Sequence, residues 1–257
     1  MSSRERVRQQ LLELAHNVGD SRHMSILGEG NVSANVDEIH FLVKASGTQM
    51  PVLRPNELVE VDRRPVLQAL ESGDHMTDGD IERLLLDVRT DPEVLKPSVE
   101  TLFHAWFLSL PGVDVVGHVH AIAVNQLLAS PWKHEFAKRR VIPDQVVYCG
   151  EESVLVPYVD PGLVLARRIA LEVDAFRERT GGVPKTVLLE NHGIIALGRH
   201  TSAVSAALAM AEKAARIFVG AASLGGPVFM EEDQVRRIAG RTDEHYRQRM
   251  LEAGTPS

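Results

Sequence analysis

The chain has only one cysteine, Cys149, among its 257 residues. A lone cysteine cannot form a disulfide within the chain, and structural disulfides are characteristic of secreted proteins. The first ten residues, MSSRERVRQQ, are charged, whereas a secretory signal requires an apolar segment of about 7 to 15 residues. We therefore expect a cytoplasmic protein without an internal disulfide.

The sequence also lacks a basic cluster and a long uncharged apolar run. It has 28 Lys and Arg residues against 35 Asp and Glu residues, for a formal net charge of -7. Nucleic acid is not an expected partner, because a phosphate backbone is bound through clustered basic side chains. A run of small apolar residues begins at Thr201, but Glu212, Lys213 and Arg216 interrupt it. A membrane span needs roughly 18 uncharged residues in a row, so we expect a helix with one buried face and no membrane partner.

No repeat, low-complexity linker or break in composition divides the chain. A hydrophobic content of 44% over 257 residues is enough for one substantial core. We therefore expect a single domain over residues 1–257, with a charged C-terminal tail from about residue 231. Helical and strand patterns alternate irregularly, which favours a three-layer α/β/α sandwich around a mixed or mainly antiparallel sheet.

Apolar periodicity and turn residues locate the expected elements. The segment 97–110 is the clearest helix, since its apolar residues recur at i, i+3, i+4, i+7, i+8 and i+11 after Pro97 and Ser98. The segment 77–89 is polar and rich in turn residues, and its structure is not assigned. The other expected helices are one that ends near His16, two that cover 63–73 and 162–181, and one that begins at Thr201. The expected strands are 31–36, 38–46, 57–62, 113–121, a hairpin of 146–150 and 154–159, 185–190 and 194–198.

Two histidines lie one residue apart in the apolar segment 114–124, DVVGHVHAIAV. Alternate residues of a strand point to opposite faces, so His118 and His120 share one face with Val116. Two imidazoles on adjacent pleats can bind one metal ion at about 2.0 to 2.1 Å. The same spacing also occurs in histidines that are hydrogen-bonded in a core, so both interpretations stay open on these residues alone.

Two further residues could complete a metal site. His192 lies in the expected turn ENHGII, where Gly193 could supply a positive φ and place the ring over the sheet edge. The alternative is a turn histidine that caps a backbone carbonyl. Glu100 is the candidate fourth group; the alternative is an acid in the first helical turn, favoured by the helix dipole and paired with His104. Three histidines and one carboxylate together match the ligands of a catalytic zinc or similar divalent ion.

Three turns are rich in small and hydroxyl residues: GEGNVS at 28–33, KASGT at 44–48 and KPS at 96–98. Their backbone N–H groups, together with Asn, Ser and Lys side chains, could hold a phosphate or another oxyanion. The alternative is ordinary turn chemistry. The glycines of GEG do not follow the dinucleotide-binding fingerprint, so no cofactor of that type is implied.

These motifs together resemble the class II aldolase/adducin family, which includes fuculose-phosphate and rhamnulose-phosphate aldolases and ribulose-phosphate 4-epimerase. The matching stretches occur in family order between residues 30 and 198. They are GNVSAN (30–35), KASGT (44–48), PSVET (97–101), GHVHA (117–121), VPYVDPG (156–162) and LLENHGIIALG (188–198).

The resemblance implies a central sheet flanked by helices, and a ring-shaped homotetramer with active sites between subunits. It also implies Zn²⁺ or another divalent ion as cofactor and a sugar phosphate as the small-molecule substrate. Glu100 lies at the position of the family's catalytic acid/base, which can also bind the metal. The resemblance further implies the metal ligands His118, His120 and His192, and the phosphate-binding residues Asn31, Ser46, Gly47 and Ser98.

The sequence departs from the family pattern at two places. Many sugar-phosphate aldolases have two serines before the glutamate, whereas Val99 follows Ser98 here, so Lys44 is a weaker candidate for the missing phosphate donor. PSVET and KASGT are most similar to the aldolase part of bifunctional rhamnulose-phosphate aldolase/dehydrogenases, although no dehydrogenase part is expected in this chain. The family's catalytic tyrosine, which comes from a neighbouring subunit, has no clear counterpart. The candidates are Tyr148, Tyr158 and Tyr246.

The expected function is that of a metal-dependent lyase that cleaves or forms a carbon–carbon bond in a sugar phosphate or related hydroxyketone through a metal-stabilised enediolate. The same site would suit an epimerase, a dehydratase or a decarboxylase. Val99 keeps these reactions open, because an aromatic or carboxylated substrate needs no second phosphate donor. A non-catalytic assembly module, as in adducin, is a further alternative, although it has no need for three histidines and a glutamate. A cupin barrel is less well supported, since its carboxylate ligand follows the histidine pair and Glu100 precedes it.

Overall fold

The computed structural model describes residues 2–19, 24–72 and 76–241. A seven-stranded sheet with the order β3-β2-β1-β4-β7-β6-β5 lies at its centre. Neighbouring strands are antiparallel except β5 and β6, which run parallel. The expectation of a mixed, mainly antiparallel sheet is confirmed. The strands are β1 (Asn31–Asn35), β2 (His40–Lys44), β3 (Leu58–Asp62), β4 (Val115–Val119), β5 (Val154–Val156), β6 (Thr186–Leu189) and β7 (Gly193–Gly198).

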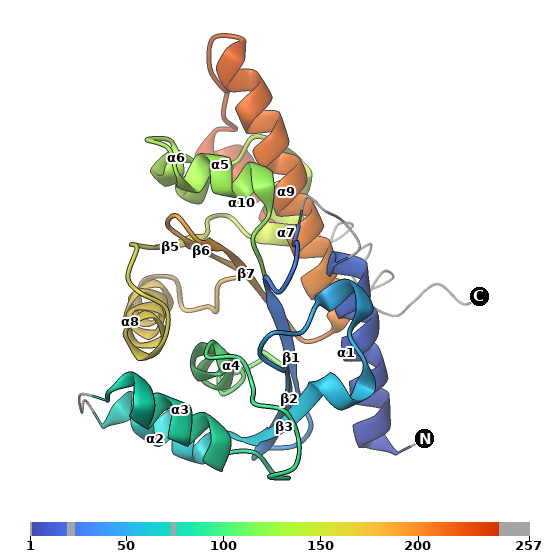
Figure 1. Cartoon of the computed structure of the whole chain (residues 1–257). Coiled ribbons are helices and arrows are strands. Elements are labelled where there is room, and N and C mark those ends of the chain that lie inside the picture. The colour runs from blue at the N-terminus through green and yellow to red at the C-terminus, as the bar shows by residue number, and fades with distance from the viewer. Residues whose placement is uncertain (1, 20–23, 73–75, 242–257) are drawn as a thin grey trace.

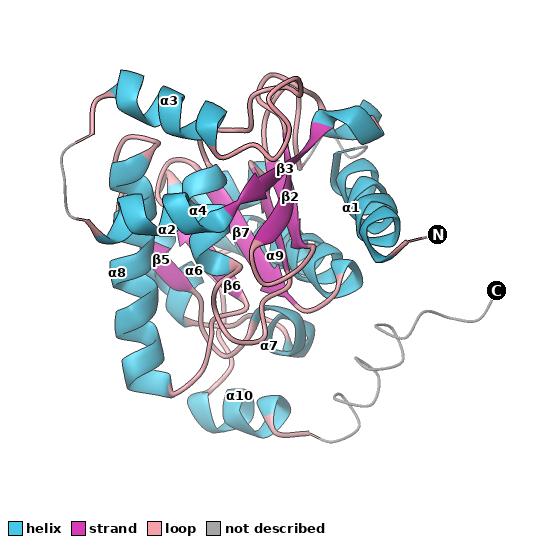
Figure 2. Cartoon of the chain, turned by 90° about the horizontal axis from the view of Figure 1, so that it is seen from below, coloured by secondary structure: helices cyan, strands magenta, loops and turns pink. Residues whose placement is uncertain are grey.

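Helices cover both faces of this sheet, and a separate hydrophobic cluster lies between the sheet and each layer of helices (Figure 1). The expected three-layer sandwich is therefore confirmed. In Figure 2 the strands occupy the middle of the molecule, with α8 and α1 on opposite sides. One layer contains α1 (Ser3–Gly19), α5 (Ile122–Leu128), α6 (Lys133–Lys138), α7 (Pro143–Cys149) and α9 (Thr201–Ser223). The other contains α2 (Arg63–Glu71), α3 (Asp78–Asp87), α4 (Thr101–Phe107) and α8 (Leu163–Thr180); two short 3-10 turns, η1 (Met50–Val52) and η2 (Pro55–Glu57), precede β3.

β4 lies in the middle of the sheet between β1 and β7, and its residues alternate between the two layers. Gly117 faces α9, which approaches so closely that a Cβ at this position would lie 2.6 Å from Cγ1 of Val204. The next residue, His118, points to the opposite face, where its ring meets Phe103 of α4 edge-on with centroids 5.9 Å apart. The sheet therefore directs the first candidate ligand into the layer that contains α4.

The segment 146–150, expected as one strand of a hairpin, is the end of helix α7. Pro143 is the first residue of that helix and Gly150 follows it with a φ of 85°. These start and stop signals outweigh the strand propensity of Val146 and Val147. β5, the expected hairpin partner, pairs in parallel with β6 instead. The hairpin prediction was therefore wrong.

The helix expected over 97–110 begins only at Thr101. Residues 96–98 pair with the loop 44–48 instead: the N–H of Ser46 donates to the carbonyl oxygen of residue 96 at 2.9 Å, and the N–H of Ser98 donates to that of residue 44 at 3.3 Å. Val99 and Glu100 then form a turn that leads into the helix. This pairing competes with the first helical turn, which the sequence pattern alone did not reveal. As a consequence, the loop 44–48 lies beside Ser98.

Three other segments complete the described chain. The unassigned segment 77–89 contains α3, which begins with a reciprocal capping pair between Thr77 and Asp80. Part of the expected charged tail is α10 (Glu232–Ala239), which packs Val235 and Ile238 against α7. Among the helices in the described ranges, including α9, none is long and apolar enough to cross a membrane.

A buried carboxylate of α9 caps helix α5. Oε2 of Glu212 accepts the N–H of Ala123 at 3.1 Å and of Val124 at 3.4 Å, whereas α5 has no side-chain cap of its own. Glu212→Ala would leave both groups without this acceptor, so we expect the free energy of unfolding to fall by about 2 to 4 kcal/mol in urea denaturation. Glu178→Ala, at an exposed position of α8, should change it by less than about 0.5 kcal/mol. A Glu212→Ala variant as stable as this control would contradict the capping role.

Candidate metal centre

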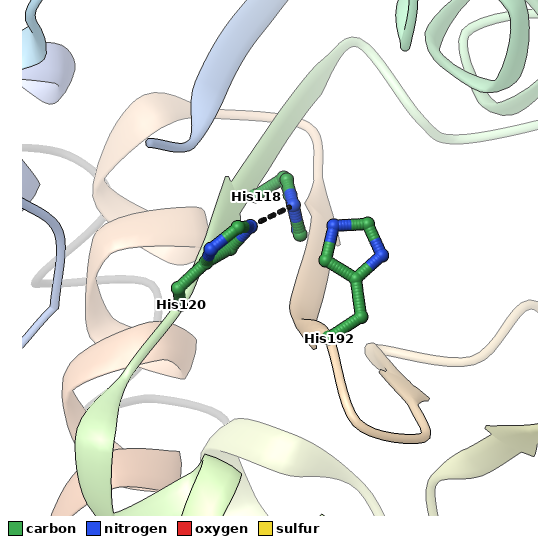
Figure 3. A group of neighbouring side chains, drawn as sticks. All are labelled: His118, His120 and His192. Atoms are coloured by element: carbon green, nitrogen blue, oxygen red, sulfur yellow. Dashed lines mark hydrogen bonds between the residues drawn. The ribbon is translucent and has the colours of Figure 1, made fainter. Parts of the chain in front are cut away.

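Three histidines from two parts of the chain meet at one end of β4 (Figure 3). His118 belongs to β4 and His120 lies just beyond its end, while His192 lies in the turn between β6 and β7. β7 pairs with β4 in a register that places His118 opposite Ile195. This pairing carries the β6–β7 turn, and with it His192, to the end of the strand that bears the other two rings.

The nitrogens of these histidines are spaced as the ligands of one ion would be. Nε2 of His118 and Nε2 of His120 are 3.1 Å apart, and one possible ligand atom from each of the three residues lies within 4.8 Å of the others. Two nitrogens that bind a tetrahedral ion at about 2.0 to 2.1 Å are about 3.3 Å apart. The donor set therefore fits zinc or a similar divalent ion.

The surroundings of His118 and His120 favour the neutral imidazole, which is the form that binds a metal. Burial lowers the pKa of His118 and of His120 from 6.5 to about 4. Nδ1 of His118 donates to the carbonyl oxygen of Ile194 at 3.1 Å. This hydrogen bond orients the ring and leaves the Nε2 lone pair directed toward His120, as in histidines that bind metals.

Glu100 places a carboxylate against the three histidines. Its Oε1 lies 3.3 Å from Nε2 of His192 and 3.6 Å from Nε2 of His118, and its Oε2 accepts a hydrogen bond from Nδ2 of Asn31. Burial raises the pKa of Glu100, but the adjacent histidines and the hydrogen bonds to its carboxylate outweigh burial, so the pKa lies well below its ordinary value. The ionised carboxylate is close enough either to bind a metal or to move a proton beside one.

The turn between β6 and β7 differs from the expectation in one respect. The left-handed residue is Asn191, with a φ of 54°, and not Gly193. Gly193 is needed for another reason: a Cβ there would lie 2.5 Å from the carbonyl oxygen of Val119, 3.0 Å from Cε1 of His118 and 3.1 Å from Cδ2 of His120. Only glycine allows β7 to approach both histidines so closely.

We expect Gly193→Ala to displace the two β4 histidines, to weaken zinc binding at least about tenfold and to destabilise the fold by about 1 to 3 kcal/mol. Competition with a chromogenic chelator measures the affinity. Gly220→Ala is the matched control, because a Cβ at that position of α9 meets open space and alanine is favoured within a helix. Equal zinc affinities in the two variants would show that the close approach does not shape the site.

Four of the expected phosphate-binding residues belong to segments that meet at Ser98. Oγ of Ser98 is 3.4 Å from Nδ2 of Asn31, which itself contacts the glutamate. Ser46 and Gly47 are exposed on the loop that pairs with the segment before Ser98. Gly47 has a φ of 76° and open space around it, so its backbone can be approached closely.

Lys44 is buried, with 2% of its surface exposed, and its ammonium group faces backbone carbonyls. It donates to Thr48 at 2.7 Å and to Gly28 and Ala45 at 3.4 Å each. Burial lowers the pKa of Lys44 to about 8, with the charge of Glu100 acting in the opposite direction. These contacts link the turn 28–33 to the turn 44–48, both of which were expected to bind an oxyanion. A direct bond from Lys44 to phosphate stays a prediction.

The candidate tyrosines lie in different surroundings. Tyr148 is partly buried in α7, between two hydrophobic clusters. Tyr158 is exposed, and its hydroxyl donates to Oδ1 of Asp160 at 3.3 Å. Tyr246 lies outside the described residues. Of the two tyrosines that the structure describes, Tyr158 is the one exposed at the surface.

Sequence reasoning missed two residues that support the site. Nδ2 of Asn125 donates to the carbonyl oxygen of His192 at 3.0 Å. Oε1 of Glu29 lies 3.9 Å from Nδ1 of His120. Both residues stand out in the sequence and could have been recognised. Asn125 is a polar residue within the apolar run that follows the histidine pair, and Glu29 is the charged residue of GEGNVS.

The fold and this cluster define an α/β/α sandwich with a candidate divalent-metal site at the end of its central strand. The chain belongs to the family described as Class II Aldolase and Adducin N-terminal domain, whose model matches residues 9–219. The resemblance found in the sequence motifs is thereby confirmed.

Individual relatives of the chain carry different names. The protein named Uncharacterized oxidoreductase YuxG, from Bacillus subtilis (strain 168), is 28% identical over 203 residues, which cover 74% of this chain and 26% of that protein. The chain therefore spans about a quarter of that relative's length. Methylthioribulose-1-phosphate dehydratase of Geobacillus kaustophilus (strain HTA426) is 29% identical over 181 residues, covering 66% of this chain and 71% of that protein. A solved L-fuculose 1-phosphate aldolase shares the fold, with a TM-score of 0.67, 17% identity, and coverage of 91% of this chain and 94% of that one.

Proposed function

We propose that this protein is a divalent-metal-dependent lyase that cleaves or forms a carbon–carbon bond in a sugar phosphate or a related hydroxyketone. The observation that carries the proposal is the ionised carboxylate of Glu100 directly beside three histidines that share one possible ligand position. Enediolate chemistry requires a proton-transferring group next to a cation. Membership in the class II aldolase and adducin family supports this class of reaction.

The residues have distinct roles in this proposal. His118, His120 and His192 would hold zinc or a similar divalent ion, and the carboxylate of Glu100 lies close enough to them to bind it as well. The bound ion supplies Lewis-acid stabilisation of the negative charge that develops on the substrate. Oε1 of Glu100 accepts or returns the proton of the reacting carbon, while Oε2 stays bound to Asn31. Because the carboxylate is ionised in the resting protein, it can act directly as the base when the bond forms. In cleavage it would first take the proton of the substrate hydroxyl group and then give it to the enediolate carbon.

The substrate phosphate would bind between the loop 44–48 and the residue pair Ser98 and Asn31. The exposed residues Ser46 and Gly47 could donate to it through the hydroxyl of Ser46 and the backbone of Gly47, and the buried charge of Lys44 favours an anion nearby. We further propose a cytoplasmic homotetramer, in which Tyr158 of a neighbouring subunit could reach the site.

A second candidate reaction on the same site is the dehydration of a sugar phosphate. The observation in its favour is the 29% identity to a methylthioribulose-1-phosphate dehydratase, against 17% to the aldolase of similar fold. Dehydration begins with removal of a proton from the carbon beside a carbonyl group and then expels water. In the lyase reaction the same group would remove that proton when the carbon–carbon bond forms, and would give a proton to the enediolate carbon after the bond breaks. The residues assigned to proton transfer and metal binding would therefore be the same.

Incubation of the zinc-loaded protein with a panel of ketose phosphates tests both candidates. Release of an aldehyde, detected by trapping, supports the lyase, whereas loss of one water in mass spectrometry supports the dehydratase. A protein that binds zinc and does neither would overturn both candidates for these substrates. Failure to bind any divalent ion, even after reconstitution, would support a non-catalytic module as in adducin.

A further inference from the structure

A chain of buried hydrogen bonds ends at the carboxylate of Glu100. Oγ of Ser33 lies 2.6 Å from Nδ1 of His104, and Nε2 of His104 contacts Oδ1 of Asn31. Nδ2 of Asn31 in turn donates to Oε2 of Glu100. Ser33 and His104 are fully buried and Asn31 is 2% exposed. His104, which the sequence suggested as a direct partner of Glu100, therefore acts on it through an asparagine.

The direction of each hydrogen bond follows from the group at the end of the chain. An ionised carboxylate only accepts hydrogen bonds, so Asn31 must turn its NH₂ group toward Glu100. The carbonyl oxygen of Asn31 then faces His104, which requires a proton on Nε2. Nδ1 is consequently an acceptor, and the hydroxyl of Ser33 donates to it. The neutral tautomer of His104 with its proton on Nε2 therefore gives every group between Ser33 and Glu100 a hydrogen-bond partner.

The secondary structure holds these residues in place. Asn31 and Ser33 are alternate residues of β1 and share one face, while His104 lies one helical turn after Glu100. The ring of Phe103 stacks on His104 with centroids 4.8 Å apart and an interplanar angle of 22°. Burial lowers the pKa of His104 to about 4, which agrees with a neutral ring. The imidazole therefore has a fixed place and a fixed pattern of donors.

We propose that His104 is a positioning residue for proton transfer: it locks the amide of Asn31, so that Glu100 is held through Oε2 and presents Oε1 to the substrate. Without the Nε2–H group of His104, the amide of Asn31 is free to rotate by about 180°. Its carbonyl oxygen would then face the Glu100 carboxylate, and the two acceptors would repel each other. The inference rests on the proposed role of Glu100 as the acid/base. It requires no change in the protonation of His104 and no contact between His104 and metal or substrate.

The tautomer can be measured without metal or substrate. In long-range proton–nitrogen NMR of the full chain with isotope-labelled histidines, we expect the proton of His104 on Nε2, assigned through its loss in His104→Gln. In Asn31→Ala this signal should shift, because its acceptor is gone. A proton on Nδ1 at neutral pH would overturn the proposal, whatever Glu100 does.

Two substitutions separate the ring nitrogens of His104. The amide nitrogen of glutamine occupies the place of Nε2 and can donate to Asn31, whereas that of asparagine stays near Nδ1 and cannot reach it. With the ketose phosphate that the wild type converts, we expect His104→Gln to keep kcat within about fivefold and His104→Asn to lower it about 10- to 100-fold at a similar KM. Both variants should bind zinc like the wild type. Equal losses in the two would indicate a merely structural role and overturn the proposal.

A substrate-free measurement keeps this inference separable from the proposed function. In the Co²⁺-loaded protein, release of Glu100 should change the visible spectrum of His104→Asn and leave that of His104→Gln like the wild type. A double-mutant cycle tests the path: in an Asn31→Ala background, His104→Asn should add less than about a threefold loss, and an undiminished loss would overturn it. If Glu100→Gln stays active, the proposed function fails, while the tautomer and the Co²⁺ spectra still decide the role of His104.

Discussion

Replacing either His118 or His192 with alanine is expected to abolish tight zinc binding. The wild type should bind about one ion per chain, because one nitrogen from each of three histidines lies within 4.8 Å of the others. Loss of a residue that only orients a ligand weakens metal binding about 10- to 100-fold, so loss of a ligand itself should weaken it more. Metal analysis after dialysis and competition with a chelator measure the change.

The two variants differ in how much packing they remove. The side chain of His118 is fully buried, whereas that of His192 is 14% exposed and lies in a turn, so His192→Ala tests binding with less risk to the fold. His134→Ala, at an exposed position of α6, is the control. Zinc should raise the Tm of the wild type and the control, since an ion that binds only the native state stabilises it. Unchanged zinc affinity in His192→Ala would remove that residue from the site.

The meeting of the three histidines could be expected from the sequence because it follows from local rules. Strand pleating places His118 and His120 on one face, and a tight turn between two strands carries His192 to a sheet edge. The order of strands in the sheet could not be read in the same way. It depends on the pairing of β4 with β7, whose residues are more than 70 positions apart in the chain.

Side-chain hydrogen bonds were the least predictable part of the site. Asn31 was expected to bind phosphate. In the structure its amide is hydrogen-bonded to His104 and Glu100, which lie about 70 residues further along the chain. The ammonium of Lys44 is bound to the carbonyls of two turns. A buried polar group takes whichever partner the fold brings near it, and no local pattern encodes that partner.

The two misassigned elements have different causes. The residues before Thr101 have a helical pattern, but backbone pairing with the loop 44–48 keeps residues 96–98 out of the helix, and Val99 and Glu100 form a turn. The segment 146–150 has valines typical of a strand, but Pro143 begins a helix and α9 offers that helix a surface on which to pack. At the first place a tertiary contact outweighs the local pattern. At the second, the start and stop signals of a helix, together with packing on α9, outweigh strand propensity, which differs by only about 1 kcal/mol between residue types.

Glu100→Gln is expected to retain zinc and to lower kcat about 100- to 10,000-fold. Glutamine preserves the shape of the side chain but cannot accept a proton. Its carbonyl oxygen can keep the hydrogen bond from Asn31, which leaves the NH₂ group where Oε1 now lies, 3.3 Å from His192. Zinc content and steady-state kinetics with the converted ketose phosphate measure the two effects separately.

The outcome also divides the two roles that the geometry allows for Glu100. If the ion is lost together with activity, the carboxylate serves mainly as a ligand; if the ion stays and turnover falls, it moves the proton. Glu178→Gln makes the same change of charge at an exposed position of α8 and should keep normal kinetics. Near-normal turnover in Glu100→Gln would remove this residue from catalysis. Because the lyase and the dehydratase both need a proton moved to or from the carbon beside the carbonyl group, the substitution should suppress whichever of the two reactions the wild type performs.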